Sequence, residues 1–148
     1  MQNGNIMSSR IILYCLTLLL PLPALSSTYG GILIDEVTSI YDADTFRVNI
    51  KDWPAIIGRH VPIRVRGMDA PEIRGRCPAE KAAAKRAREE TVNLLRNAEN
   101  IELRQLQRGK YFRILAEVYV DGQNLAETLI SKKLARPYAG GKRQSWCN

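Results

Sequence analysis

Apolar and polar residues alternate along several short segments of the chain, which is the pattern of strands that bury one face. In residues 45–50, Phe46, Val48 and Ile50 alternate with polar neighbours and are expected to face a core. Turn-forming residues separate these segments, and Asp121 followed by Gly122 is a strong turn signal. The segments expected to be strands are residues 32–40, 45–50, 63–66, 100–106 and 113–120.

Two other segments repeat apolar residues every three or four positions, as amphipathic helices do. The longer one, residues 79–98, follows Pro78, which suits a first helical position because its missing N–H needs no partner there. The shorter one, residues 125–133, follows Asn124, which resembles a capping box together with Glu127. The buried face of the longer helix is expected to carry Ala84, Ala87, Thr91, Leu94, Leu95 and Ala98.

Five short strands with a helix between the third and the fourth predict a mainly β fold of the α+β kind. We expect a five-stranded OB-fold Greek-key barrel with two helices. A ferredoxin-like α/β sandwich is the alternative, but it requires an alternation of strands and helices that this order lacks. We place this single domain at residues 31–148.

Residues 1–30 differ from the rest of the chain in composition. Arg10 is their only charged residue, and it precedes an apolar run over residues 11–20 and a stretch of proline and small residues. This is the layout of a secretory signal peptide, which we expect over residues 1–26. A transmembrane anchor is the alternative, but the apolar run is shorter than the roughly 20 residues that a helix needs to span a bilayer. We therefore expect a periplasmic or secreted protein.

The net charge of the chain is +7. A basic exported domain is suited to polyanions, a class that includes nucleic acid, acidic polysaccharide and anionic membrane surfaces. Charge alone does not choose among these partners.

Cys77 and Cys147 are the two cysteines that follow the expected signal peptide. An even pair in an oxidising compartment suggests a disulfide between them, and two free thiols are the alternative. The chain has one histidine, His60, and no Cys-x-x-Cys pair, so the usual ligands of a zinc site are lacking.

Four carboxylates occur near the ends of the first three expected strands. Asp42 and Asp44 lie in the turn between the first two strands, and Asp69 and Glu72 follow the third. Because these strands are neighbours in such a barrel, the acids can converge at one edge. Oxygen ligands without sulfur or imidazole suit Ca²⁺, and Arg64 can bind phosphate oxygens beside them. The alternative is a surface ion-pair cluster at a strand end.

A basic element precedes the fifth expected strand. Residues 110–113, Lys-Tyr-Phe-Arg, combine phosphate-binding cations with aromatic faces on which a base can stack. They are a candidate nucleotide contact.

The order and spacing of these motifs resemble the staphylococcal nuclease (thermonuclease) family. The resemblance rests on residues 42–45 (Asp-Ala-Asp-Thr), on Arg64 five residues before residues 69–72 (Asp-Ala-Pro-Glu), and on residues 111–113 (Tyr-Phe-Arg). It continues through residues 121–126 and 134–135, and so extends from about residue 37 to residue 138. Phe112 and Ala43 stand at positions where the family usually has glycine.

The resemblance implies an OB-fold enzyme that uses Ca²⁺ to hydrolyse phosphodiester bonds of DNA and RNA. It assigns Ca²⁺ to the carboxylates of Asp44 and Asp69 and to the backbone carbonyl of Ala70. Glu72 would act as the general base, or orient the attacking water. The remaining assignments are Arg64 and Arg113 as phosphate-binding catalytic residues, and Lys110, Tyr111 and Tyr138 as substrate-binding residues.

A nuclease is therefore the leading hypothesis, acting on DNA and RNA as a monomer without stable membrane association after processing. An OB-fold module that binds nucleic acid without cleaving it is the first alternative. A structural envelope protein that holds anionic polymers is the second. A pure binding module has no need of a carboxylate cluster that repels phosphate, so the complete cluster favours the enzyme.

Overall fold

The computed structural model describes residues 31–147. The expected signal peptide, residues 1–26, lies outside the described residues. Within residues 31–147, no helix is long and apolar enough to cross a membrane.

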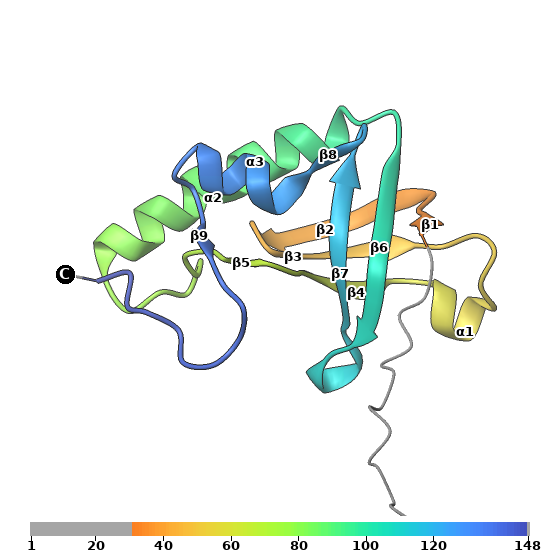
Figure 1. Ribbon diagram of the computed structural model, residues 1–148, viewed down its shortest axis with the longest axis horizontal. Coiled ribbons are helices and arrows are strands. Elements are labelled where there is room, and N and C mark those ends of the chain that lie inside the picture. Colours follow the sequence, from red (N-terminus) through yellow and green to blue (C-terminus); the bar gives the residue numbers. More distant parts are fainter. Residues whose placement is uncertain (1–30, 148) are drawn as a thin grey trace, which may run out of the picture.

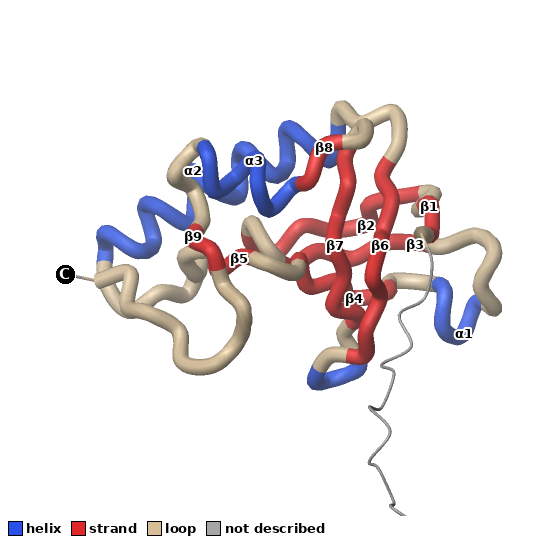
Figure 2. Tube along the Cα trace, viewed as in Figure 1, coloured by secondary structure: helices blue, strands red, loops and turns tan. Residues whose placement is uncertain are grey.

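The described chain is mainly β, as predicted (Figures 1 and 2). One sheet has the strand order β1-β6-β7-β4-β3-β2, with β8 paired to β7, and β5 and β9 form a separate pair. The strands are β1 (Ile32–Leu33), β2 (Glu36–Asp42), β3 (Thr45–Asn49), β4 (Val61–Val65), β5 (Met68–Asp69), β6 (Ile101–Arg108), β7 (Ile114–Val120), β8 (Gln123–Asn124) and β9 (Arg136–Pro137).

The consecutive strands β1 and β2 form the two opposite edges of the sheet. The sheet is therefore curled, because only a few residues connect these edges. Ile32 of β1 pairs with Leu103 of β6, whereas Val37 of β2 pairs with Val48 of β3. β4 and β7 are parallel and the other neighbours are antiparallel. This is the OB-fold-like architecture that the strand order predicts. The predicted first strand, residues 32–40, is divided into β1 and β2.

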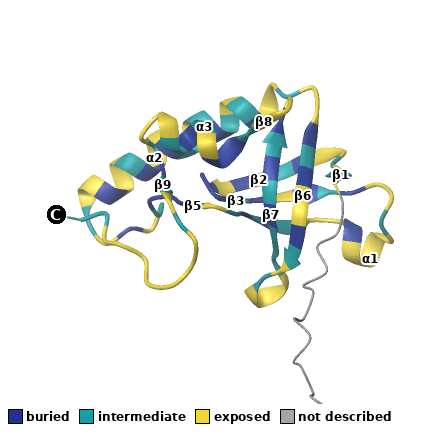
Figure 3. Ribbon diagram, in the orientation of Figure 1, coloured by how far each residue is buried: buried dark blue, intermediate teal, exposed yellow. Residues whose placement is uncertain are grey.

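The core lies inside the curled sheet, where alternate strand residues point inward. Buried and less buried positions alternate along β7 (Figure 3). The largest fully buried aliphatic and aromatic side chains include Phe46, Ile63, Leu103, Leu125 and Leu129. Phe46 and Ile63 are direct partners across β3 and β4, so strand pairing and core packing fix the same register.

Two helices cover one side of the sheet, and they correspond to the two expected helices. α2 (Pro78–Arg96) and α3 (Leu125–Ser131) lie next to each other in Figures 1 and 2. Asn124 caps α3 by accepting hydrogen bonds from the N–H groups of Ala126 and Glu127 at 2.9 and 3.3 Å. α2 ends two residues before the predicted residue 98, and α3 two residues before the predicted residue 133.

α2 is attached to β2 and to the turn that follows it. Arg88 Nε and Arg96 Nη1 donate hydrogen bonds to backbone carbonyls of β2 at 3.1 and 2.8 Å. Thr91 Oγ1 lies 3.3 Å from the carbonyl of Ala43. The buried residues of α2 are Glu80, Ala84, Ala87, Thr91 and Leu95, so Leu94 and Ala98 are less buried than expected and Glu80 is an unexpected buried acid.

Besides β5 and β8, three short elements occur outside the segments predicted as strands and helices. They are the four-residue helix α1 (Ala55–Gly58), the 3₁₀ turn η1 (Lys110–Phe112) and the strand β9, which pairs with β5. The β5–β9 pair matters for the site, because it brings the C-terminal tail next to Asp69.

Candidate functional site

Asp44 occupies the turn between β2 and β3 and is 1% exposed. Its Oδ1 accepts a hydrogen bond from Thr45 Oγ1 at 2.9 Å, and its Oδ2 accepts one from the N–H of Ala70 at 3.2 Å. Its own carbonyl accepts a hydrogen bond from the N–H of Val65 at 2.8 Å. These contacts join the turn to the ends of β4 and β5.

Arg64 of β4 lies beside this carboxylate because β4 pairs with β3, with Arg64 opposite Thr45. Arg64 Nη1 forms an ion pair with Asp44 Oδ1, and Arg64 Nη2 lies 3.8 Å from Asp69 Oδ1. The Arg64 side chain is 17% exposed, so part of it remains open to solvent. The guanidinium therefore bridges the two carboxylates predicted to bind metal.

Asp69 and Glu72 lie in and after β5. Gly67 precedes them with a φ of +86°, a conformation that L side chains rarely adopt, and so reverses the chain after β4. Asp69 is buried, whereas the Glu72 side chain is 36% exposed. The N–H of Glu72 donates to the buried Glu80 of α2 at 3.4 Å, which fixes the backbone that presents the Glu72 carboxylate.

The C-terminal tail also enters the site. Arg143 pairs through Nε with Asp69 Oδ1 and through Nη1 with Glu72 Oε1, and its Nη2 donates to the carbonyl of Ala70 at 2.9 Å. Trp146 Nε1 donates to Asp69 Oδ2 at 3.0 Å. The structure contains a disulfide between Cys77 and Cys147, which joins the end of this tail to the start of α2.

Two groups in the site have shifted pKa values. Burial, followed by the negative charge of Asp44, raises the pKa of Asp42 to about 8. Burial alone would lower the pKa of the Arg143 guanidinium, but its hydrogen bond to Glu72 and the charge of Asp69 outweigh burial and raise it. The raised pKa of Asp42 favours its neutral form at neutral pH, and the raised pKa of Arg143 keeps its guanidinium charged beside Asp69 and Glu72.

The donor atoms of this cluster fit a hard cation. The carboxylates of Asp44 and Asp69 and the carbonyl of Ala70 supply only oxygen, which is what Ca²⁺ prefers. Among the described residues, Asp42 Oδ1 and Asp69 Oδ1 are buried side-chain oxygens without a hydrogen bond. Asp69 Oδ1 has ion-pair contacts only. Buried carboxylate oxygens are costly unless a cation compensates them, and at Asp69 Oδ1 the guanidiniums of Arg64 and Arg143 do so in this structure.

A comparison with protein families agrees with this geometry. The model of the family described as "Staphylococcal nuclease homologue" matches residues 62–145, more than half of the chain. The chain belongs to the staphylococcal nuclease family. The matched segment of this nuclease-family domain contains Arg64, Asp69, Glu72 and Arg113, and it also contains Arg143. No curated protein matches the chain.

The structure brings together five of the predicted site residues of this nuclease-family domain. Asp44, Arg64, Asp69, Ala70 and Glu72 are joined directly, or through Arg143, by the contacts given above. Their metal-binding and catalytic roles stay predictions.

The remaining predicted residues lie on two other segments. Lys110 and Tyr111 belong to η1, where Tyr111 is 85% exposed, and Arg113 directly precedes β7. Leu115 of β7 is the register partner of Arg64, so Arg113 lies two residues before that partner in the chain. Tyr138 follows β9, and its N–H donates to the carbonyl of Gly67 at 3.0 Å. Within residues 31–147, none of these four side chains is hydrogen-bonded or ion-paired to the carboxylate cluster.

Three residues of the site in this nuclease-family chain were not predicted from the sequence: Arg143, Trp146 and Glu80. Arg143 and Trp146 are 74 and 77 residues away from Asp69, so no local pattern links them to it. The nearby Cys147 was the available signal, because a bridge to Cys77 must return the tail to the start of α2. Glu80 was signalled by its position three residues after Cys77, the helix N-cap, where acids commonly bind backbone N–H groups.

Proposed function

We propose that this protein is an exported, calcium-dependent nuclease that hydrolyses the phosphodiester bonds of DNA and RNA. The observation that carries the proposal is the convergence of Asp44, Asp69 and the Ala70 carbonyl with Arg64 and Glu72, in a chain of the staphylococcal nuclease family. Carboxylates beside a guanidinium are the groups that metal-assisted phosphodiester hydrolysis requires.

Asp44, Asp69 and the carbonyl of Ala70 would hold Ca²⁺. When bound, the ion would supply Lewis-acid polarisation of the phosphate and neutralise part of its charge. The buried Asp44 is held by backbone and side-chain donors, so its carboxylate is oriented before any ion arrives. An exported protein also suits such a site, because extracellular calcium modules work at about 10⁻⁴–10⁻³ M.

Glu72 would accept the proton of the attacking water, or orient that water. Its carboxylate is the most exposed acid of the cluster, and its backbone is fixed by Glu80. Arg64 and Arg113 would neutralise the charge that develops on the phosphoryl oxygens, since a guanidinium offers donors in a fork that matches two of those oxygens. Such fixed donors typically contribute about 10²–10³ in rate each.

Lys110, Tyr111 and Tyr138 would contact the nucleotide. Tyr111 exposes a large aromatic face on η1, which is suited to stacking on a base of single-stranded nucleic acid. The net charge of +7 favours association with polyanions and predicts that binding weakens as salt increases.

The proposed location is the periplasm or the medium. It rests on the signal-like composition of residues 1–26 and on the Cys77–Cys147 disulfide, since disulfides persist in oxidising compartments. We propose a monomer that is not stably bound to membrane after processing.

The experiment is cleavage of single-stranded DNA and RNA by the purified protein, with Ca²⁺ or with a chelator. We expect shortened products with Ca²⁺ only, and no products from a Glu72→Gln variant under the same conditions. Cleavage that persists undiminished in chelator, or that is unaffected in the Glu72 variant, would contradict the proposal.

A second function is favoured by one observation. Arg143 occupies oxygens of the proposed metal ligands and of Glu72, as expected in a domain that binds nucleic acid without cleaving it. Binding of single-stranded DNA without any cleavage at millimolar Ca²⁺, in the wild-type protein and in a variant without Arg143, would favour this binding module over the nuclease.

A further inference from the structure

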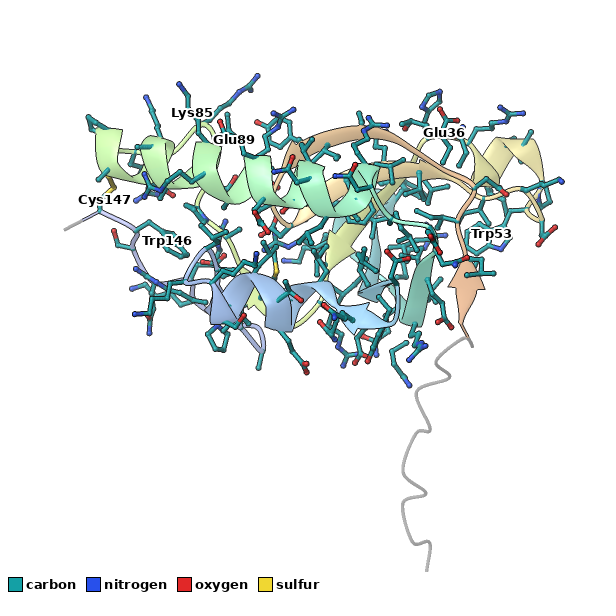
Figure 4. All side chains as sticks on the ribbon, turned by 90° about the horizontal axis from the view of Figure 1, so that it is seen from above. Glu36, Trp53, Lys85, Glu89, Trp146 and Cys147 are labelled. Atoms are coloured by element: carbon teal, nitrogen blue, oxygen red, sulfur yellow. A yellow bond between two sulfur atoms is a disulfide. The ribbon has the colours of Figure 1, made fainter. Side chains whose placement is uncertain are left out.

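The C-terminal tail, residues 138–147, returns to the carboxylate cluster and is held at both ends. At its start, the N–H of Tyr138 donates to the carbonyl of Gly67 at 3.0 Å. At its end, Cys147 is joined to Cys77. Figure 4 shows Trp146 and Cys147 beside the N-terminal end of α2. The tail is therefore a closed loop across the site rather than a free end.

The path of the loop is set by a turn at two consecutive glycines. Gly140 and Gly141 have φ values of +106° and +89°, and space is open around both Cα atoms. Tyr138 Oη donates to the carbonyl of Gly141 at 2.7 Å, which closes this turn. Only glycine adopts such conformations without strain, so the sequence at this point permits the reversal that brings Arg143 back to Asp69.

Trp146 fixes the second half of the loop. Its indole N–H donates to Asp69 Oδ2 at 3.0 Å, and the guanidinium of Arg136 stacks over its ring at 3.8 Å from the centroid. Arg136 Nη1 also donates to the carbonyl of Ser145 at 2.9 Å. These contacts fix the backbone near Arg143, which lies three residues before Trp146, and so hold the Arg143 side chain at the carboxylate cluster.

Arg143 uses the same oxygen atoms that a cation would use. Its guanidinium contacts Asp69 Oδ1 and the carbonyl of Ala70, two of the three proposed metal ligands, and also the carboxylate of Glu72. A Ca²⁺ ion needs six to eight oxygens at about 2.3–2.6 Å, so it would use the oxygens that the guanidinium contacts and would be repelled by its positive charge. Binding of the ion and docking of Arg143 therefore oppose each other.

We propose that the C-terminal tail is an intramolecular competitor of the metal ion, in which Arg143 occupies the cation position and must leave before an ion is bound. This inference rests on the proposed function, because it assigns regulation to the same site. The Cys77–Cys147 bridge keeps the competitor at a high effective concentration, since both ends of a short loop are tethered. The tail thus raises the Ca²⁺ concentration at which the site fills.

The test is the Ca²⁺ dissociation constant of the full processed chain, measured by calorimetry without substrate. Arg143→Ala should bind Ca²⁺ about tenfold more tightly than wild type, or better, within the range typical of coupled sites. Lys142→Ala is the matched control, because it removes the same charge from the neighbouring exposed residue and should change the affinity by less than about twofold. A double variant, Cys77→Ser with Cys147→Ser, should lie between wild type and Arg143→Ala, because it releases one end of the loop.

Trp146 gives a second measurement on the wild-type protein, which also serves if the Arg143 variant fails to fold. Ca²⁺ should change the fluorescence of Trp146 as the tail leaves Asp69, and the change should be absent in Trp146→Phe, which retains Trp53 as the other tryptophan. Ca²⁺ binding without this change would overturn the proposal.

Two failures are distinguishable. Equal Ca²⁺ affinities of Arg143→Ala and Lys142→Ala, in a protein whose cleavage requires Ca²⁺, would overturn the competition but leave the proposed function intact. Absence of Ca²⁺ binding in all variants would overturn the proposed function, and the competition with it.

Discussion

Asp44 accepts a hydrogen bond of 3.2 Å from the N–H of Ala70, although 26 residues separate the two. The contact joins the turn after β2 to the segment after β5, and it orients a carboxylate by means of backbone rather than a flexible side chain. Two of the proposed metal ligands are therefore fixed relative to each other by the fold itself.

Asp44→Asn should separate the structural role of this residue from its role in metal binding. The amide oxygen can still accept from Ala70, so the thermal midpoint in chelator should fall only as far as the loss of the ion pair with the partly exposed Arg64 requires. Ca²⁺ affinity should fall about tenfold or more, because ligand charge sets the affinity of such sites. Calorimetry measures this, with the exposed Asp52→Asn as control. An unchanged affinity would remove Asp44 from the ligand set.

Arg64→Ala and Arg113→Ala should have different effects on stability. Both should lower kcat by about 10²–10³, because each removes a fixed phosphate donor. Only Arg64→Ala should also lower the thermal midpoint in chelator, since Arg64 is paired with the buried Asp44 and its loss leaves that charge poorly compensated. Arg59→Ala, an exposed arginine in another loop, is the control. Near-normal cleavage by Arg113→Ala would mean that Arg113 is not a phosphate ligand.

Phe112 can be tested by comparing two truncations. Its φ is +59° and its side chain is 80% exposed, so the ring contributes little burial while the Cβ carries backbone strain. Phe112→Gly and Phe112→Ala both delete the ring, but only glycine relieves the strain. The glycine variant should be more stable than the alanine variant by about 1 kcal/mol. Urea unfolding measures the difference, and equal stabilities would show that the turn relaxes around alanine.

The disulfide should contribute to stability more than to chemistry. Replacing both Cys77 and Cys147 by serine should lower the free energy of unfolding by up to about 4 kcal/mol on the chain-entropy account, for a separation of 70 residues. Serine at position 77 retains a side-chain acceptor for the N–H of Glu80, so the cap of α2 should survive. Thiol titration of the denatured, unreduced protein without the expected signal peptide, which contains Cys15, should find no free thiol, and two per chain would refute the bridge.

Local patterns of apolar and polar residues predict most strands and both longer helices of the fold. The alternation around Phe46 and Ile63 predicts strands whose inward faces meet, and Asn124 predicts the start of α3 because its side chain can satisfy the first N–H groups of a helix. The boundaries were less predictable. The break between β1 and β2 depends on the curvature of the sheet, which is a property of the whole barrel.

The candidate site was predictable only as far as strand neighbours determine it. Asp44 and Asp69 converge because consecutive strands are adjacent, and that adjacency follows from the strand order. Arg143 reaches the same oxygens through the β5–β9 pair and the disulfide, two long-range contacts that periodicity does not encode. Glu80 is absent from the predicted buried face of its helix, because periodicity marks apolar positions only, whereas two backbone N–H groups that need acceptors hold it in the interior.

Glu80→Ala should therefore impair catalysis from a position outside the metal ligands. Glu80 accepts hydrogen bonds from the N–H groups of Arg76 and Glu72 at 2.9 and 3.4 Å, and its loss leaves both without this partner at a cost of about 1–3 kcal/mol. The segment carrying Glu72 should loosen, so kcat should fall while Ca²⁺ affinity, which depends on Asp44 and Asp69, changes less.

The control for this variant is Glu89→Ala on the same helix. Glu89 is exposed and points away from the sheet in Figure 4, so its removal should alter neither stability nor kcat. Glu80→Gln should be intermediate, because an amide retains one acceptor oxygen for two N–H groups. Steady-state cleavage and calorimetry on the three variants make the comparison. If Glu80→Ala kept a normal kcat while losing stability, Glu80 would only support the fold, and the position of Glu72 would have to depend on other contacts.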